Sequence, residues 1–138
     1  MESDKVVIIV QNSLGKLFVH QRSAKKKIFP LLYGLGAGGC VNSGESPEQA
    51  AERELKEELN INNKVKSLFN IYFKSESLNH KVHVFYVKYD GNLKPSNEFQ
   101  WSGWLDIAGV DRLAEENKLC PDTKVFYEKW KKEYEKLN

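Results

Sequence analysis

The sequence predicts an α/β fold in which a mixed β-sheet lies between helical layers. β-rich runs stand on both sides of one strongly capped helix, and amphipathic helical segments close the chain. A length of 138 residues fits one domain, which we assign to residues 1–138. With 41% hydrophobic and 29% charged residues, the chain has enough apolar area for a buried core.

The first elements are expected to be a β-hairpin and a glycine-rich segment. Residues 6–10 and 16–21 are β-rich, and the Asn, Ser and Gly residues between them are typical of a turn. A basic, irregular stretch covers residues 22–30. Five glycines follow within residues 34–44, which indicates that the backbone there turns sharply or approaches another group closely.

A helix is predicted to begin at Ser46 and to end near Asn60. Ser46 is a favourable N-cap, Pro47 suits the first helical position, and Gln49 completes a capping box. Asn60 can adopt the left-handed conformation that ends many helices. The apolar residues at four-residue spacing form the expected buried stripe, namely Ala51, Leu55 and Leu59.

Three more strands and two helices complete the predicted fold. The strands are expected at residues 65–73, 82–89 and 99–105. A helix is expected at about residues 108–116, and Pro121 introduces a final amphipathic helix. The buried face of this last helix is expected to consist of Val125, Phe126, Trp130 and Tyr134.

Charge and cysteine content argue against several kinds of partner. The net charge of +2 provides no global field for nucleic acid or a membrane. The apolar run at residues 6–10 is far shorter than a signal peptide core or a membrane span, so we expect a cytoplasmic protein. Cys40 and Cys120 form no CxxC pair and indicate neither a zinc site nor a disulfide framework. The expected partner is a small molecule, and a homodimer is left open.

The predicted helix carries three carboxylates on one face. Glu54, Glu57 and Glu58 are spaced at i, i+3 and i+4, so their side chains emerge about one turn apart. Their mutual repulsion would be offset by a hard divalent cation with oxygen ligands. Arg53 lies four residues before Glu57 and could hold it in position. The alternative interpretation is a solvated acidic face.

Glycines and cations next to this helix suggest a phosphate site. Gly39 and its glycine neighbours allow the backbone to come close to a bound anion or metal. Residues 45–58 hold six acidic and two basic residues, whereas Arg22 and Lys26 lie in a basic segment upstream. A metal on one side and cations on the other fit a diphosphate.

The spacing of these residues resembles the Nudix box, G-x5-E-x7-R-E-U-x-E-E-x-G-U. Gly39, Glu45 and residues 53–61 match it, so the box spans residues 39–61. Only Asn60 departs from the pattern, at a position where glycine is usual. Asn is the next-best residue for the left-handed region, so the helix end should be preserved.

The resemblance implies the Nudix fold, an α/β/α sandwich with a mixed β-sheet. It also implies hydrolysis of a nucleoside diphosphate linked to another group, with Mg²⁺ or Mn²⁺ bound by the carboxylates of Glu54, Glu57 and Glu58. In such chemistry the metal neutralises phosphate oxygens while hydroxide attacks phosphorus in line.

Two further roles are implied by the same resemblance. Glu54 is the first choice for the general base, and Glu98 competes with it because a glutamate beyond the box often serves in relatives. Glu45 and Arg53 are expected to orient the loop and the helix.

A closer resemblance connects residues 21–30 to isopentenyl-diphosphate isomerase and the hydrolases grouped with it. The isomerase residues that match Arg22 and Lys26 grip the substrate diphosphate, although a solvated basic loop is the alternative. The catalytic cysteine of the isomerase aligns with Gly38, and its metal-binding histidine aligns with Cys40. Hydrolysis is therefore expected rather than isomerisation.

Other functions and residues were weighed against this hypothesis. A non-catalytic Nudix-fold sensor of nucleotides or RNA is a third reading, and the intact glutamates argue against it. His80 and His83 should face opposite sides of a strand and are not expected to share a metal. Trp101, Trp104 or Tyr33 could stack a nucleobase, although a core position is the default for each.

Overall fold

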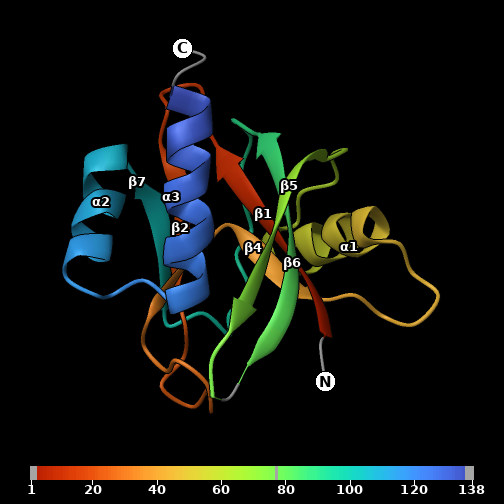
Figure 1. Cartoon of the computed structure of the whole chain (residues 1–138). Helices are drawn as coiled ribbons and strands as arrows, with labels where there is room; N and C mark the ends of the chain where they lie inside the picture. The colour runs from red at the N-terminus through yellow and green to blue at the C-terminus, as the bar shows by residue number, and fades with distance from the viewer. Residues whose placement is uncertain (1–2, 77, 136–138) are drawn as a thin grey trace.

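The computed structural model describes residues 3–76 and 78–135. It shows an α/β/α arrangement with a seven-stranded mixed sheet (Figure 1). The elements in chain order are β1 (Ser3–Gln11), β2 (Leu17–Gln21), β3 (Tyr33–Leu35), β4 (Ala37–Cys40), α1 (Pro47–Leu59), β5 (Lys66–Lys74), β6 (Asn79–Lys88), β7 (Trp101–Leu105), α2 (Ile107–Glu115) and α3 (Pro121–Glu135).

Strand β1 is at the centre of the sheet. It pairs in parallel with β6 and antiparallel with β2 and β4. The remaining pairs, β5 with β6 and β2 with both β3 and β7, are antiparallel. Figure 1 shows α1 on one side of the sheet and α2 and α3 on the other. The predicted mixed sheet between helical layers is therefore confirmed.

The predicted N-terminal hairpin is present between β1 and β2. Gln11 is paired with Leu17, and Gly15 adopts a left-handed φ of 80° in the turn. The side-chain oxygen of Asn12 accepts hydrogen bonds from the backbone N–H groups of Leu14 and Lys16. This is the role that favours Asn in turns.

Helix α1 has both of its predicted ends. The Ser46 side chain accepts a hydrogen bond from the Gln49 N–H, and the Gln49 side chain accepts one from the Ser46 N–H. Asn60 ends the helix in the left-handed region with a φ of 57°. Local signals at each end therefore fix where the acidic residues of α1 fall on the helix.

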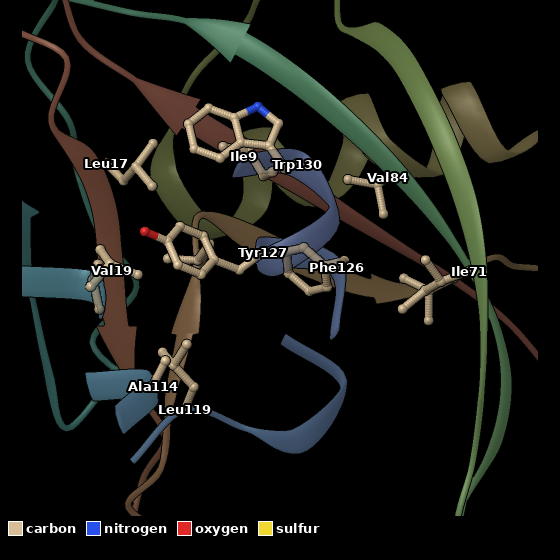
Figure 2. Close-up of a cluster of buried hydrophobic side chains, with 13 residues drawn as sticks. Ile9, Leu17, Val19, Ile71, Val84, Ala114, Leu119, Phe126, Tyr127 and Trp130 are labelled. Atoms are coloured by element: carbon tan, nitrogen blue, oxygen red, sulfur yellow. The ribbon is translucent and has the colours of Figure 1, made fainter. Parts of the chain in front are cut away.

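The sheet buries one hydrophobic cluster on each face. Ile9 and Val84 face α3, where Figure 2 shows Phe126, Tyr127 and Trp130 projecting into the same cluster. The opposite face packs against the buried stripe of α1 and contains Val6, Ile8, Val10, Ala51, Leu55 and Leu59. Alternate residues of β1 thus enter different clusters, as the two-residue period of a strand requires.

The predicted buried face of α3 is wrong at one residue. Val125 is 43% exposed, whereas Tyr127 is 1% exposed. Phe126 and Trp130 are buried as expected, and Tyr134 packs against the cluster. Trp130 is three or four positions from Phe126, Tyr127 and Tyr134, so these residues share one face of the helix. Val125 lies outside this face.

The structure bears on membrane association in one respect. Among residues 3–76 and 78–135, no helix is long and apolar enough to cross a membrane. The longest helix, α3, has 15 residues and many charged side chains.

Candidate active site

A cleft of about 340 Å³ collects most of the residues singled out in the sequence. Its walls come from the segment between β2 and β3, the strands β3 and β4, the end of α1, the segment before β7 and the start of α3. The expected site residues that line it are Arg22, Lys26, Gly39, Glu58 and Glu98. Glu54 lies directly behind Gly39.

Glu58 is fixed at the inner end of the acidic helix face. The Gly38 N–H donates a hydrogen bond of 2.9 Å to its Oε1. Burial raises the pKa of Glu58 to about 7, and the charges of Glu54 and Glu57 add to this effect. The Gly38 hydrogen bond and the positive charge of Lys26 act in the opposite direction. A group with this pKa is poised to exchange its proton for a cation near neutral pH.

Gly39 makes room for the carboxylate of Glu54. A Cβ atom at position 39 would overlap Oε1 and Cδ of Glu54 and would lie 2.8 Å from Oε2. The Glu54 side chain is only 14% exposed, and burial raises its pKa although Arg53 lowers it. The glycine of the box is therefore needed for the position of a carboxylate rather than for an unusual φ angle.

Arg53 connects the acidic residues of the box to one another. It makes a bidentate ion pair with Glu45, with distances of 2.8 Å from Nε and 2.9 Å from Nη2. Its Nη1 lies 2.8 Å from Glu54 Oε1 and 3.4 Å from Glu57 Oε2. Nη2 also donates to the Cys40 carbonyl at 3.0 Å. The hydrogen bonds from Arg53 hold the pKa of Glu45 at about 2.

The three helix carboxylates fit a hard divalent cation by their chemistry. Among the described residues, no three His, Cys, Asp or Glu side chains are grouped as a preformed metal cluster. Glu54 and Glu57 turn toward Arg53, and Glu58 turns toward Gly38. Burial is the main cause that raises the pKa of Glu54 and Glu58, and repulsion from neighbouring carboxylates adds to it, so a cation among these oxygens would relieve both effects.

The cations of the cleft are on the segment between β2 and β3. Arg22 Nε donates to the Ile28 carbonyl at 3.0 Å, which holds this guanidinium against its own loop. Lys26 is exposed and close enough to Glu58 to lower its pKa. Positive charge thus faces the acidic end of α1 across the cleft.

Glu98 reaches the same cleft from the segment that precedes β7. Its N–H donates to the Ser96 hydroxyl at 3.1 Å. The Ser96 N–H donates in turn to the Glu58 carbonyl at 2.7 Å. The two hydrogen bonds tie this segment to the end of α1, and both Glu98 and Glu58 line the cleft, whereas Glu54 lies behind Gly39 and is not part of its lining.

Two charged residues of the cleft escaped the sequence reasoning. Lys5 lines the cleft, and its Nζ donates to Cys40 Sγ at 2.7 Å. Asp122, in the first turn of α3, lines the wall on the α3 side. Lys5 meets Cys40 because β1 and β4 pair antiparallel, and no local pattern announces that register.

The three histidines each have a different hydrogen-bond partner. His80 Nδ1 lies 2.7 Å from the Ser3 hydroxyl, whereas His83 Nε2 lies 3.0 Å from Asp4 Oδ1. His20 Nδ1 donates to the Gly36 carbonyl at 2.7 Å, and its ring stacks on Phe99 at 4.5 Å. Burial lowers the pKa of His20 to about 4, so the ring is neutral at physiological pH.

The two tryptophans of β7 face opposite sides of the strand. Trp104 packs edge-on against Phe18 at 5.5 Å, in the cluster shared with α1. Trp101 is exposed and contacts Tyr33 at 6.0 Å. Neither tryptophan lines the main cleft, so both lie away from the residues expected to bind a diphosphate.

Together, the fold and the cleft define an α/β/α sandwich protein whose carboxylate-bearing helix faces a cationic loop. The chain belongs to the NUDIX domain family, whose model matches residues 1–129. The Nudix fold and the resemblance seen in the box are thereby confirmed.

Relatives and solved structures agree with this assignment. The chain is 41% identical over 101 residues to an uncharacterized Nudix hydrolase from Nostoc sp., covering 70% of this chain and 59% of that protein. It is 32% identical over 100 residues to the ADP-ribose pyrophosphatase of Methanocaldococcus jannaschii, covering 68% and 56%. The crystal structure of DR0079 from Deinococcus radiodurans superimposes with a TM-score of 0.79 at 25% identity, covering 92% of this chain and 82% of that one. The chain thus spans less than two thirds of the length of either sequence relative.

Proposed function

We propose that the protein is a hydrolase that requires Mg²⁺ or Mn²⁺ and cleaves the diphosphate linkage of a nucleoside diphosphate derivative. The observation that carries this proposal is the cleft in which Arg22 and Lys26 face Glu58 and Glu98. Cations on one wall suit phosphate oxygens, and carboxylates on the other suit a divalent metal. ADP-ribose is the first substrate to test, because the Methanocaldococcus jannaschii relative is named as an ADP-ribose pyrophosphatase.

Glu54, Glu57 and Glu58 are the residues that would hold the metal. When bound, the metal supplies neutralisation of phosphate charge and a lower pKa for water. Arg53 and Glu45 keep the loop before α1 and the helix in register through their bidentate ion pair. The absence of glycine at position 60 does not disturb this arrangement, since Asn60 adopts the required left-handed conformation.

The remaining residues divide into substrate binding and proton transfer. Lys26 and the Nη groups of Arg22 bind the diphosphate oxygens, while Arg22 Nε stays on the Ile28 carbonyl. Glu54 takes the proton from the attacking water, and Glu98 is the competing base. Support for Glu54 is its fixed position between Gly39 and Arg53. Support for Glu98 is its place on the cleft wall.

Hydrolysis is favoured over isopentenyl diphosphate isomerisation by the surroundings of Gly38. A Cβ at this position would lie 2.7 Å from the Val6 carbonyl oxygen, so a cysteine would require the backbone to shift. Cys40 is exposed, accepts a hydrogen bond from Lys5 and is absent from the cleft lining. Cys120 does line the cleft, but from α3's side rather than from position 38, and burial raises the pKa of its thiol to about 12. An acid able to protonate a double bond is therefore missing from position 38.

A substrate panel tests the proposal directly. ADP-ribose, dinucleoside polyphosphates, nucleotide sugars, nucleoside triphosphates and prenyl diphosphates are incubated with the protein and Mg²⁺, and the products are resolved by chromatography. We expect cleavage of a nucleotide diphosphate linkage and no dimethylallyl diphosphate from isopentenyl diphosphate. Formation of dimethylallyl diphosphate above background, or cleavage of no compound in the panel, would overturn the proposal.

A further inference from the structure

The segment between β2 and β3 is a closed loop rather than an irregular flap. The Arg22 N–H donates to the Leu32 carbonyl at 2.8 Å, and the Leu31 N–H donates back to the Arg22 carbonyl at 3.1 Å. Within the loop, the Lys26 N–H donates to the Ser23 carbonyl at 3.2 Å. These bonds give the loop a defined shape at the mouth of the cleft, which it lines with Arg22, Lys26, Ile28 and Phe29.

Two residues of this loop have left-handed backbones although neither is glycine. Phe29 has a φ of 53° and Leu31 has a φ of 64°. The turn explains Leu31, because Pro30 precedes it and the Leu32 N–H donates to the Phe29 carbonyl at 3.3 Å, as in a type II turn. Phe29 is the first residue of that turn, where a left-handed backbone is not required.

Phe29 combines this left-handed backbone with a side chain that lines the cleft. Phe29 is half-buried and lines the cleft, whereas Leu31, two residues later, is exposed and does not. Residues kept in such unfavourable backbone regions cluster at ligand sites, where the surrounding structure holds them in place. Here the closed loop supplies that constraint, and its result is a ring on the same wall as Arg22 and Lys26.

We propose that Phe29 is a specificity-determining residue, whose ring packs against the planar nucleobase of the substrate while Arg22 and Lys26 bind the diphosphate. This inference rests on the proposed function. Beyond the cations, the cleft is lined by both apolar and polar residues, and the polar ones include Asp122 and the buried Thr123. A planar ring with hydrogen-bonding edges suits this mixed lining, because its face can pack on the Phe29 ring while its edges meet polar groups.

The test compares two non-hydrolysable probes that differ only in the nucleoside. These are α,β-methylene-ADP and methylenediphosphonate, whose P–C–P bridge cannot be cleaved. Affinities are measured by titration calorimetry with Mg²⁺ for the wild type and three variants. Phe29→Asn removes the ring and lowers the conformational strain of the left-handed backbone, because Asn tolerates that region. Phe29→Tyr keeps the ring, and Leu31→Asn is the matched control at an exposed left-handed position.

We expect Phe29→Asn to weaken α,β-methylene-ADP binding about 10-fold and methylenediphosphonate binding less than about twofold, in line with the loss of one stacking contact. Phe29→Tyr and Leu31→Asn should bind both probes as the wild type does. For a cleaved substrate, Phe29→Asn should raise KM with little change in kcat. Wild-type affinity of Phe29→Asn for the nucleotide, or equal losses for both probes, would overturn the proposal.

Failure of this inference can be told apart from failure of the proposed function. Binding of α,β-methylene-ADP does not require cleavage, so the comparison of variants still decides the role of Phe29 if no diphosphate is hydrolysed. A wild-type protein that binds neither probe overturns both proposals.

Discussion

Replacing Gly39 with alanine is expected to disable the site while leaving the fold largely stable. The added Cβ would overlap the carboxylate of Glu54. Glu54 is 14% exposed and is held at 2.8 Å by Arg53, so it can move away only by losing this ion pair. The overlapping atoms are the end of a flexible side chain, and the φ angle of Gly39 is not left-handed, so the backbone can stay in place.

The expected losses of stability and of turnover in Gly39→Ala depend on which group has to move. Overpacking of this kind costs about 1 kcal/mol in the free energy of unfolding when a side chain yields. Displacing a catalytic carboxylate by about 1 Å costs roughly 100-fold in turnover. Urea denaturation measures the first quantity, and initial rates with Mg²⁺ on the best substrate of the panel measure the second.

A double-mutant cycle identifies Glu54 as the cause. Gly39→Ala is combined with Glu54→Ala, and the free energy of unfolding is measured for all four proteins. Because the truncated side chain no longer meets the new methyl group, Gly39→Ala should cost almost nothing in the Glu54→Ala background. The same cost in both backgrounds, or wild-type turnover of Gly39→Ala, would refute the reasoning.

Three further outcomes are expected. Glu58→Gln should lower metal-dependent turnover at least about 100-fold with an unchanged circular dichroism spectrum, because it removes the charge of a proposed metal ligand but keeps the shape of the side chain; wild-type turnover would contradict the assignment of the box. Arg22→Ala and Lys26→Ala should raise KM more than they lower kcat, and the effect should shrink at high salt. An unchanged KM in both variants would show that these cations are solvated and do not bind the diphosphate. His20, with its pKa lowered from 6.5 to about 4, binds a proton more readily in the unfolded chain, so its contribution to stability is complete above pH 6.5 and is lost as the pH falls toward 4. Urea denaturation at pH 7 and pH 5 should therefore show up to about 2 kcal/mol more loss in the wild type than in His20→Gln, and parallel losses would contradict this.

The sequence predicted the elements whose signals are local. Ser46 and Asn60 mark the two ends of α1 because capping depends on a few neighbouring residues. The spacing of Glu54 and Glu58 on one helical face follows from the same boundaries. Val125 was placed wrongly because two adjacent apolar residues leave the helix free to rotate by one position, and only the packing against the sheet decides.

The parts of the site that escaped prediction depend on tertiary register. Lys5 meets Cys40 only through the antiparallel pairing of β1 with β4, across residues far apart in the chain. The left-handed backbone of Phe29 is equally hidden, because Phe gives no local signal for that region and the closed loop imposes it. The space behind Gly39 is visible only once Glu54 is placed.

The most direct measurement of the central claim is the incorporation of ¹⁸O from labelled water into the products of the best panel substrate. The reaction is followed across a Mg²⁺ titration, with an EDTA control and with Glu58→Gln as the matched variant. The account predicts one ¹⁸O atom on a product phosphate, formed at a rate that rises with Mg²⁺ and is almost absent with EDTA or in the variant. Unlabelled products, or labelled products formed at the wild-type rate without metal or without the Glu58 carboxylate, would contradict it.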